Sequence, residues 1–282
     1  MVKQKKPKGR VKGPRREEEI EEMEEMEEIE EIEEPEETFD YMSTEELVEH
    51  MVSLGLNVTE ELALELAKRE DALFHIRKIL QDGMYWRRTG SGDGWTPVHA
   101  IHILPLIKTR DALELLLDIM RYNNEDLGDW ITEDTPVLLA AFGEDAIAPL
   151  KEFASDETLE SFVRGATTTA LNVIAHRYPA HQEEILNHFR MLLADTSDAV
   201  FGTLLICEIL SFGNPSVLDE VYSAFDEGWV DTFLIGTDDV EDMLNDEKQE
   251  YMMFMEREPL DHFSKENIYR LMEANPPEEE AA

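Results

Sequence analysis

Residues 133–150 read EDTPVLLAAFGEDAIAPL, and the start of this stretch has a counterpart earlier in the chain. Thr-Pro-Val occurs here and again 39 residues earlier, in WTPVHAIHILPL at residues 95–106, each time before a short apolar run. Asp or Thr can cap a helix, Pro suits its first turn and Gly suits its end. The recurrence therefore predicts structural repeats. We take their recurring positions to be Pro97, Pro136 and Gly143.

Helical spacing of apolar residues divides the region from residue 95 to residue 228 into four helix pairs. They are 96–107 with 110–123, 135–143 with 144–154, 158–179 with 180–195, and 198–213 with 214–228. One such pair cannot bury its apolar face alone, whereas stacked neighbours can. No stretch shows the sustained alternation of a strand. We therefore predict an all-α fold, a right-handed α-solenoid of helix pairs.

The segments on either side of the repeats predict the remaining organisation of the chain. Helices are expected after the capping residues Ser43 and Thr59 and over 71–86, with a loop at 87–94. The predicted domains are a tail at 1–38, N-terminal helices capping the solenoid at 39–94, repeats at 95–226, an acidic linker with C-terminal capping helices at 227–275, and a disordered end at 276–282. The C-terminal helices are expected to pack on the last helix pair and seal it.

The tail, residues 1–38, is basic and then acidic. It holds 8 basic and 15 acidic side chains, and the apolar residues of its Glu run recur every three positions. That spacing gives no fixed helix face, and Glu residues four apart repel one another. We expect a disordered charged tail.

The charge and cysteine content of the whole chain exclude several classes of protein. The net charge is −40, of which −7 lies in residues 1–38 and −33 in the remainder. A body this acidic repels phosphate backbones, so nucleic-acid binding by it is not expected. The acidity suits either solubility, including in a salt-rich cytoplasm, or a basic protein partner. Cys207 is the only cysteine, which excludes an internal disulfide and a Cys-cluster zinc site. With no long apolar run and no secretory signal, a cytoplasmic protein without a membrane segment is expected. The oligomeric state is left open.

Several stretches resemble HEAT-like repeats of the kind named for phycobilisome lyases. DALELLLDIM and EDAIAPLKEFASD are similar to the second helix of such a unit. Residues 129–156, 164–195 and 224–240 resemble an uncharacterised bacterial family of HEAT-like proteins, and the resemblance covers roughly residues 94–245. A Cys-rich zinc motif of the SEC-C kind can follow in that family and is not expected here. The resemblance implies a solenoid fold and no catalytic residues.

Two sets of residues are candidates for chemistry. His99 and His102 lie three residues apart on one predicted helix, a spacing that suits either a packed histidine pair or two metal ligands; we favour the packed pair. Asp129, Glu133 and Asp134 flank Trp130, but with 65 acidic residues such neighbours are common. A helix start is the simpler interpretation. We predict no catalytic residue, no cofactor and no metal ligand.

The function predicted from the sequence is a non-enzymatic protein–protein interaction scaffold with an acidic surface for a basic or basic-patched partner. The alternatives are a chromophore-handling protein or enzyme accessory subunit, by analogy with bilin lyases, and a regulator that competes with nucleic acid for a basic protein. The residues predicted to contact a partner are Asp129, Trp130, Glu133, Asp134, Trp229, Phe233, Asp238 and Asp239.

Overall fold

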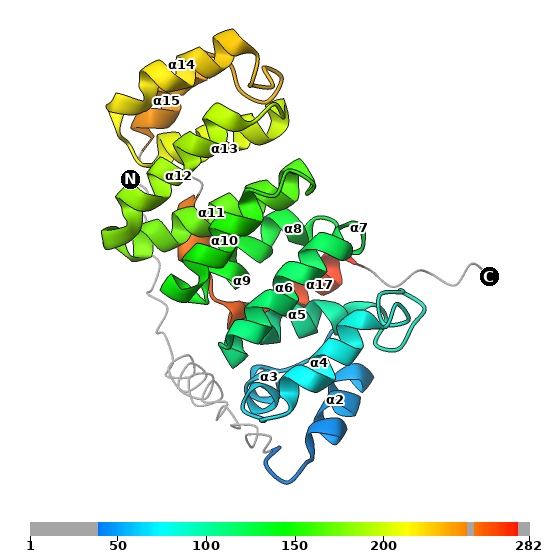
Figure 1. Ribbon diagram of the computed structural model, residues 1–282. Helices are drawn as coiled ribbons and strands as arrows, with labels where there is room; N and C mark the ends of the chain where they lie inside the picture. Colours follow the sequence, from blue (N-terminus) through cyan, green and yellow to red (C-terminus); the bar gives the residue numbers. More distant parts are fainter. Residues whose placement is uncertain (1–38, 247–250, 276–282) are drawn as a thin grey trace, which may run out of the picture. The chain divides into compact units, whose positions relative to one another are not determined.

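The computed structural model describes residues 39–246 and 251–275, and every element in these ranges is a helix (Figure 1). The all-α prediction is confirmed for this part of the chain, where no strand occurs. The predicted disordered segments, 1–38 and 276–282, lie outside the described residues. Within the described ranges no helix has both the length and the apolar character needed to cross a membrane.

Three N-terminal helices form where the capping residues predict them. They are α2 (Thr44–Ser53), α3 (Glu60–Ala67) and α4 (Ala72–Gln81). Ser43 and Glu46 make a reciprocal capping box at the start of α2, and the Thr59 hydroxyl accepts from the Leu62 amide at the start of α3. Such caps satisfy backbone N–H groups that have no partner inside the helix.

Helices occur at the positions of the four predicted pairs. They are α5 (Trp95–Ile107) with α6 (Arg110–Tyr122), α9 (Thr135–Ala140) with α10 (Ile147–Ala154), α11 (Ser161–Arg177) with α12 (Gln182–Asp195), and α13 (Ala199–Ser211) with α14 (Leu218–Glu227). Successive pairs touch, because α5 contacts α9, α9 contacts α11 and α11 contacts α13. Short helices α7 (Asn124–Leu127) and α8 (Trp130–Glu133) join the first two pairs.

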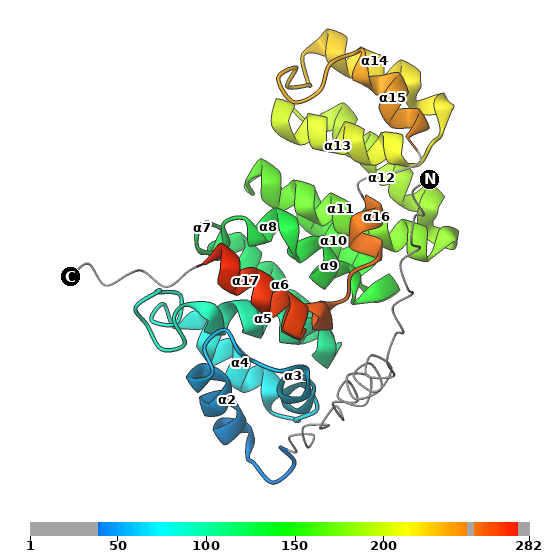
Figure 2. The same cartoon turned by 180° about the vertical axis from the view of Figure 1, so that it is seen from behind.

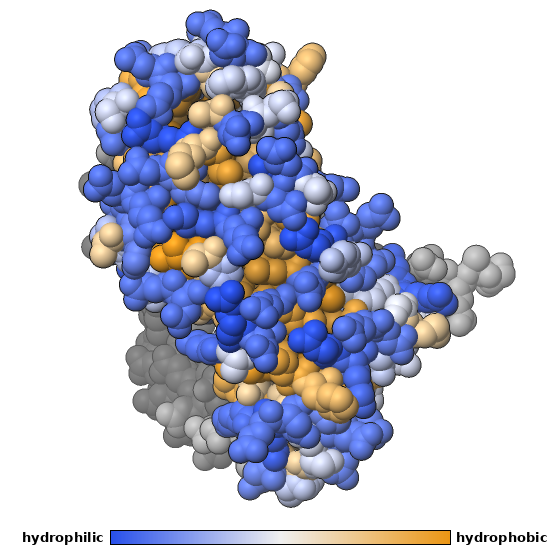
Figure 3. All heavy atoms as spheres, in the orientation of Figure 1, coloured by the Kyte–Doolittle hydropathy of each residue, from blue (hydrophilic) through white to orange (hydrophobic). Residues whose placement is uncertain are grey.

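Helix α5 is buried nearly all round, since α3, α4, α6 and α9 pack against it. Its polar residues Thr96, His99 and His102 are therefore enclosed with its apolar ones. On the outer surface, Figure 3 shows mostly hydrophilic residues in this view, with hydrophobic ones gathered mainly around α6.

The two Thr-Pro-Val copies occupy helix starts, but their capping differs from the prediction. Pro136 lies in the first turn of α9, and Gly143 has a left-handed φ of +71° beyond its end, as expected. Asp134, however, makes no capping hydrogen bond, because its carboxylate is engaged elsewhere. In the earlier copy, Pro97 lies in the first turn of α5, whose N-cap is Gly94.

The C-terminal segment takes a course that the sequence does not predict. Helix α15 (Asp239–Asn245) packs on α13, but α16 (Tyr251–Met255) contacts α11 and α9. The 3₁₀ helix η4 (Pro259–Phe263) contacts α5 and α3, and α17 (Lys265–Ala274) follows it (Figure 2). The prediction that this segment seals the last helix pair is therefore wrong beyond α15. The segment lies against α5, α9 and α11, where Phe254 and Phe263 are buried and where Arg257 and His262 have polar partners.

The contact between α13 and the loop that follows α14 depends on Gly202. A methyl group at this position would lie 2.1 Å from the Trp229 carbonyl oxygen, far inside contact distance, whereas one at Gly83 would meet nothing within 4 Å. We predict that Gly202→Ala lowers the free energy of unfolding by about 2 kcal/mol, measured by urea denaturation. Gly83→Ala is the matched control and should change it by less than about 1 kcal/mol. Equal unfolding midpoints for the two variants would contradict this packing.

Candidate functional site

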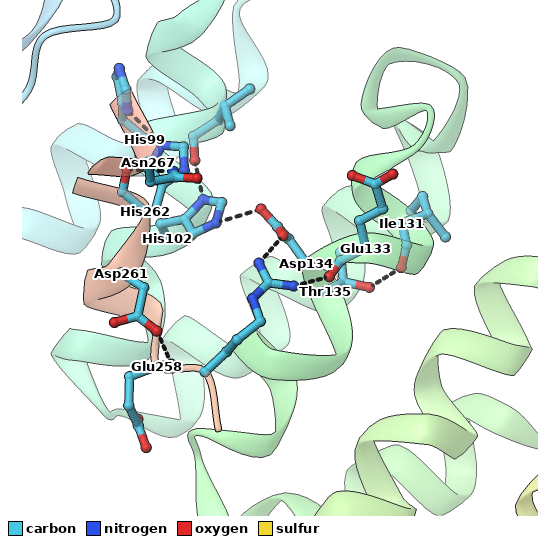
Figure 4. A network of polar contacts seen from close by, with 12 residues as sticks. His99, His102, Ile131, Glu133, Asp134, Thr135, Glu258, Asp261, His262 and Asn267 are labelled. Carbon is cyan, nitrogen blue, oxygen red and sulfur yellow. Dashed lines mark hydrogen bonds and ion pairs between the residues drawn. The ribbon is translucent and has the colours of Figure 1, made fainter. Parts of the chain in front are cut away.

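A buried carboxylate, Asp134, lies at the centre of the polar network in Figure 4. The residue is 4% exposed, and one of its carboxylate oxygens, Oδ2, lies 3.0 Å from Nε2 of His102. The other oxygen accepts from the guanidinium of Arg257, which also donates to the Glu133 carbonyl at 2.6 Å. Burial alone would raise the pKa of Asp134, but hydrogen bonds and charge from His102 and Arg257 outweigh it and lower the pKa to about 2.

His102 is held by acceptors at both ring nitrogens. Nδ1 lies 2.8 Å from the Val98 carbonyl oxygen and Nε2 faces the Asp134 carboxylate. Neither partner can donate, so the ring donates from both nitrogens and forms an ion pair with Asp134. An ion pair enclosed in this way is favourable only when its remaining hydrogen-bonding positions are filled, as they are here by Val98 and Arg257.

His99 and His262 form a second, neutral pair. His99 Nε2 donates to the Gly55 carbonyl at 2.8 Å, so its Nδ1 accepts from Nε2 of His262 at 2.9 Å. This fixes the tautomer of His262 and leaves its Nδ1 unprotonated, buried and without a hydrogen-bond partner among the described residues. Burial lowers the pKa of His99 to about 4, and burial together with the neighbouring His102 and His99 lowers the pKa of His262 well below its ordinary value.

Aromatic rings enclose these histidines. The His102 and His262 rings are stacked at 3.8 Å with an interplanar angle of 16°. Trp130 stands edge-on to both, and Trp95 meets Trp130 edge to face. Both tryptophans thus fill space between helices. Beside the rings lies an open pocket of about 810 Å³, lined in part by Asp134, Arg257 and His262, through which solvent reaches the edge of the cluster.

The predicted partner-contacting residues at this place fall into three groups by their exposure. Asp129 and Glu133 are exposed, so their side chains are accessible. Trp130 is half-buried against the histidines. Asp134 is buried and paired, so its assignment as a partner-facing residue is a wrong prediction. Its neighbour Pro136 begins a helix as predicted, but the carboxylate serves the network and not the helix end.

Sequence reasoning favoured a packed pair for His99 and His102, and the structure places both in one packed cluster. It missed Arg257 and His262, which lie 123 and 163 residues from their respective partners Asp134 and His99. The one signal in the sequence is the segment EREPLDH, residues 256–262, in which one Arg and one His lie between acidic residues.

A second candidate surface lies in the loop after α14 and on α15. Phe233 is 100% exposed and Leu234 is 52% exposed. Asp238 and Asp239 are also exposed, whereas Trp229 is half-buried. An open pocket of about 760 Å³ adjoins Leu234, and none of the described residues that line it is basic. The remaining residues that line it are Ile235, Asp239, Glu241, Asp242, Met243, Asn245 and Asp246.

This chain is thus a helical protein whose C-terminal segment is fixed to its first helix pairs by buried charge. Residues 23–275 match the family described as "Protein of unknown function (DUF1186)", and the chain belongs to that family. It is also similar to an uncharacterized protein of Chlamydia trachomatis, with 22% identity over 185 residues, covering 63% of this chain and 70% of that protein. No solved structure matches the chain. The HEAT-like character of the repeats stays a prediction.

Removal of the central carboxylate tests whether it fixes the C-terminal segment. Asp134→Ala leaves Arg257 and His102 without their counter-charge, so the free energy of unfolding should fall by about 3 kcal/mol in urea. Amide hydrogen exchange over residues 251–275 should also become faster. The control is Arg190→Ala, which breaks a surface pair with Glu220 and should cost less than about 1 kcal/mol. Unchanged exchange in Asp134→Ala would contradict the role given to this residue.

The lowered pKa of His99 makes stability depend on pH. The unfolded chain takes up the proton near pH 6.5, whereas the folded protein resists it down to about 4. Stability from this group is therefore fully present above pH 6.5 and is lost as the pH falls from 6.5 to 4, by about 3 kcal/mol. In His99→Gln, unfolding free energies measured between pH 7.5 and 4 should fall less steeply. Equal slopes for the two proteins would contradict the assignment.

Proposed function

We propose that this protein is a non-enzymatic interaction scaffold, in which stacked HEAT-like helix pairs form an α-solenoid that carries an acidic docking surface. The partner is a basic protein segment that also offers an apolar side chain. The observation that carries the proposal is Phe233, a phenyl side chain fully exposed to solvent among acidic residues. Aromatic residues of this kind serve as anchors at protein interfaces.

The charge around Phe233 supports a basic partner. The stretch from residue 226 to residue 247 contains nine acidic and no basic residues. Carboxylates at the rim of an interface steer a basic partner and raise its association rate, and a buried aromatic anchor supplies affinity. Leu234 and the adjoining 760 Å³ pocket extend the apolar contact beyond one ring.

The acidic docking surface is distinct in its chemistry from the histidine cluster. At the cluster every charged group faces a partner within the chain, whereas the exposed carboxylates Asp238 and Asp239 face solvent. We therefore assign recognition to the loop and α15 and structural support to the cluster. Asp129 and Glu133 remain available as a second contact for a large partner.

Site-specific crosslinking tests this proposal. A photoreactive phenylalanine analogue at position 233 should capture a basic protein in the native cell, and the purified partner should bind with an affinity that falls between about 50 and 300 mM salt. Phe233→Ala should weaken that binding by at least about 10-fold, as loss of an anchor does.

The matched control is Phe162→Ala, which removes another exposed phenylalanine, 52% exposed, on α11. It should bind as the unmodified protein does. Equal weakening by both substitutions, or affinity that does not change with salt, would overturn the proposal. Circular dichroism of each variant confirms that the helices are intact.

A further inference from the structure

We propose that His102, His262 and Asp134 bind a divalent transition-metal ion. Each offers one ligand atom, and these atoms lie within 4.8 Å of one another although the residues come from α5, η4 and the start of α9. All three side chains are buried. Imidazole and carboxylate are ligands that suit zinc and its first-row neighbours, whereas Mg²⁺ and Ca²⁺ prefer oxygen ligands alone.

The ligand that points to a metal is His262. Its Nδ1 lone pair is buried without a hydrogen-bond partner, a condition that costs about 1–3 kcal/mol in a folded protein. A metal ion accepts the lone pair, and the Asp134 carboxylate offsets the ion's charge.

His102 is already oriented as a ligand. Its Nδ1 donates to the Val98 carbonyl, the kind of hydrogen bond that fixes the ring of a metal-binding histidine and leaves Nε2 for the ion. Nε2 and Oδ2 of Asp134 are 3.0 Å apart. Two ligand atoms at about 2.1 Å from one tetrahedral ion are about 3.4 Å apart, which is close to this separation. The ion replaces the proton between them, which is released to solvent.

Coordination requires one movement. A metal ion lies in the plane of each imidazole that binds it, and the stacked rings of His102 and His262 have nearly parallel planes. The His262 ring must therefore turn about its Cβ–Cγ bond toward Asp134, losing its hydrogen bond to His99, which contributes about 1 kcal/mol. The adjoining pocket of about 810 Å³ gives the ring room and the ion an entry route.

Zinc binding to the full chain tests the inference. After treatment with a chelator, the protein should bind one equivalent of Zn²⁺ by isothermal titration calorimetry, with proton release that follows the ionisation enthalpy of the buffer. Zn²⁺, but not Mg²⁺, should slow amide exchange over residues 251–275, because the ion ties η4 to α5. This measurement needs no variant, so it holds even if the substituted proteins fold poorly.

Substitutions then identify the ligands. His102→Gln and His262→Gln should each weaken Zn²⁺ binding by at least about 100-fold. His188→Gln is the matched control, since His188 is a buried histidine of α12 whose Nε2 also has no hydrogen-bond partner. It should bind Zn²⁺ as the unmodified protein does. Absence of Zn²⁺ binding, or equal binding by His262→Gln and the unmodified protein, would overturn the proposal.

Discussion

The Asp134 carboxylate is the constraint on which the rest of the structure depends. A charge this deeply buried must be compensated, and its two partners come from α5 and from the segment after α16. The C-terminal segment therefore lies against the first helix pairs and not at the end of the chain of pairs. His262 and His99 complete the junction with a neutral hydrogen bond. Apolar packing also holds the segment, since Phe254 and Phe263 belong to the hydrophobic core.

The two candidate sites differ in how their charges meet the solvent. Around Phe233 the carboxylates are solvated, so they act at long range and are screened by salt. Around Asp134 the charges are shielded from water, so their electrostatic interactions are strong, and each charge needs a partner of opposite sign. An acidic chain can thus carry an open acidic surface and a closed charged junction together. Among the described residues, Asp134 is the acidic side chain that is buried, and it is paired with Arg257.

The sequence predicts local structure well here because the deciding signals are local. Ser43 with Glu46 and Thr59 cap the helices that they precede, and apolar spacing locates all four helix pairs. The junction could not be predicted in the same way. Arg257 pairs with a carboxylate 123 residues away, and no periodicity relates two such positions. A local interpretation of Asp134 as a helix cap was chemically reasonable, and it failed because a distant cation competes for the carboxylate more strongly than a backbone amide.

The return of the C-terminal segment has a consequence during synthesis. At about 5–20 residues per second, the ribosome makes His262 on the order of 10 s after Asp134. During that interval the helix pairs can form, but α5 lacks the segment that covers its histidines, and Asp134 lacks Arg257. A nascent or prematurely ended chain therefore exposes a polar and aromatic face that the finished protein hides.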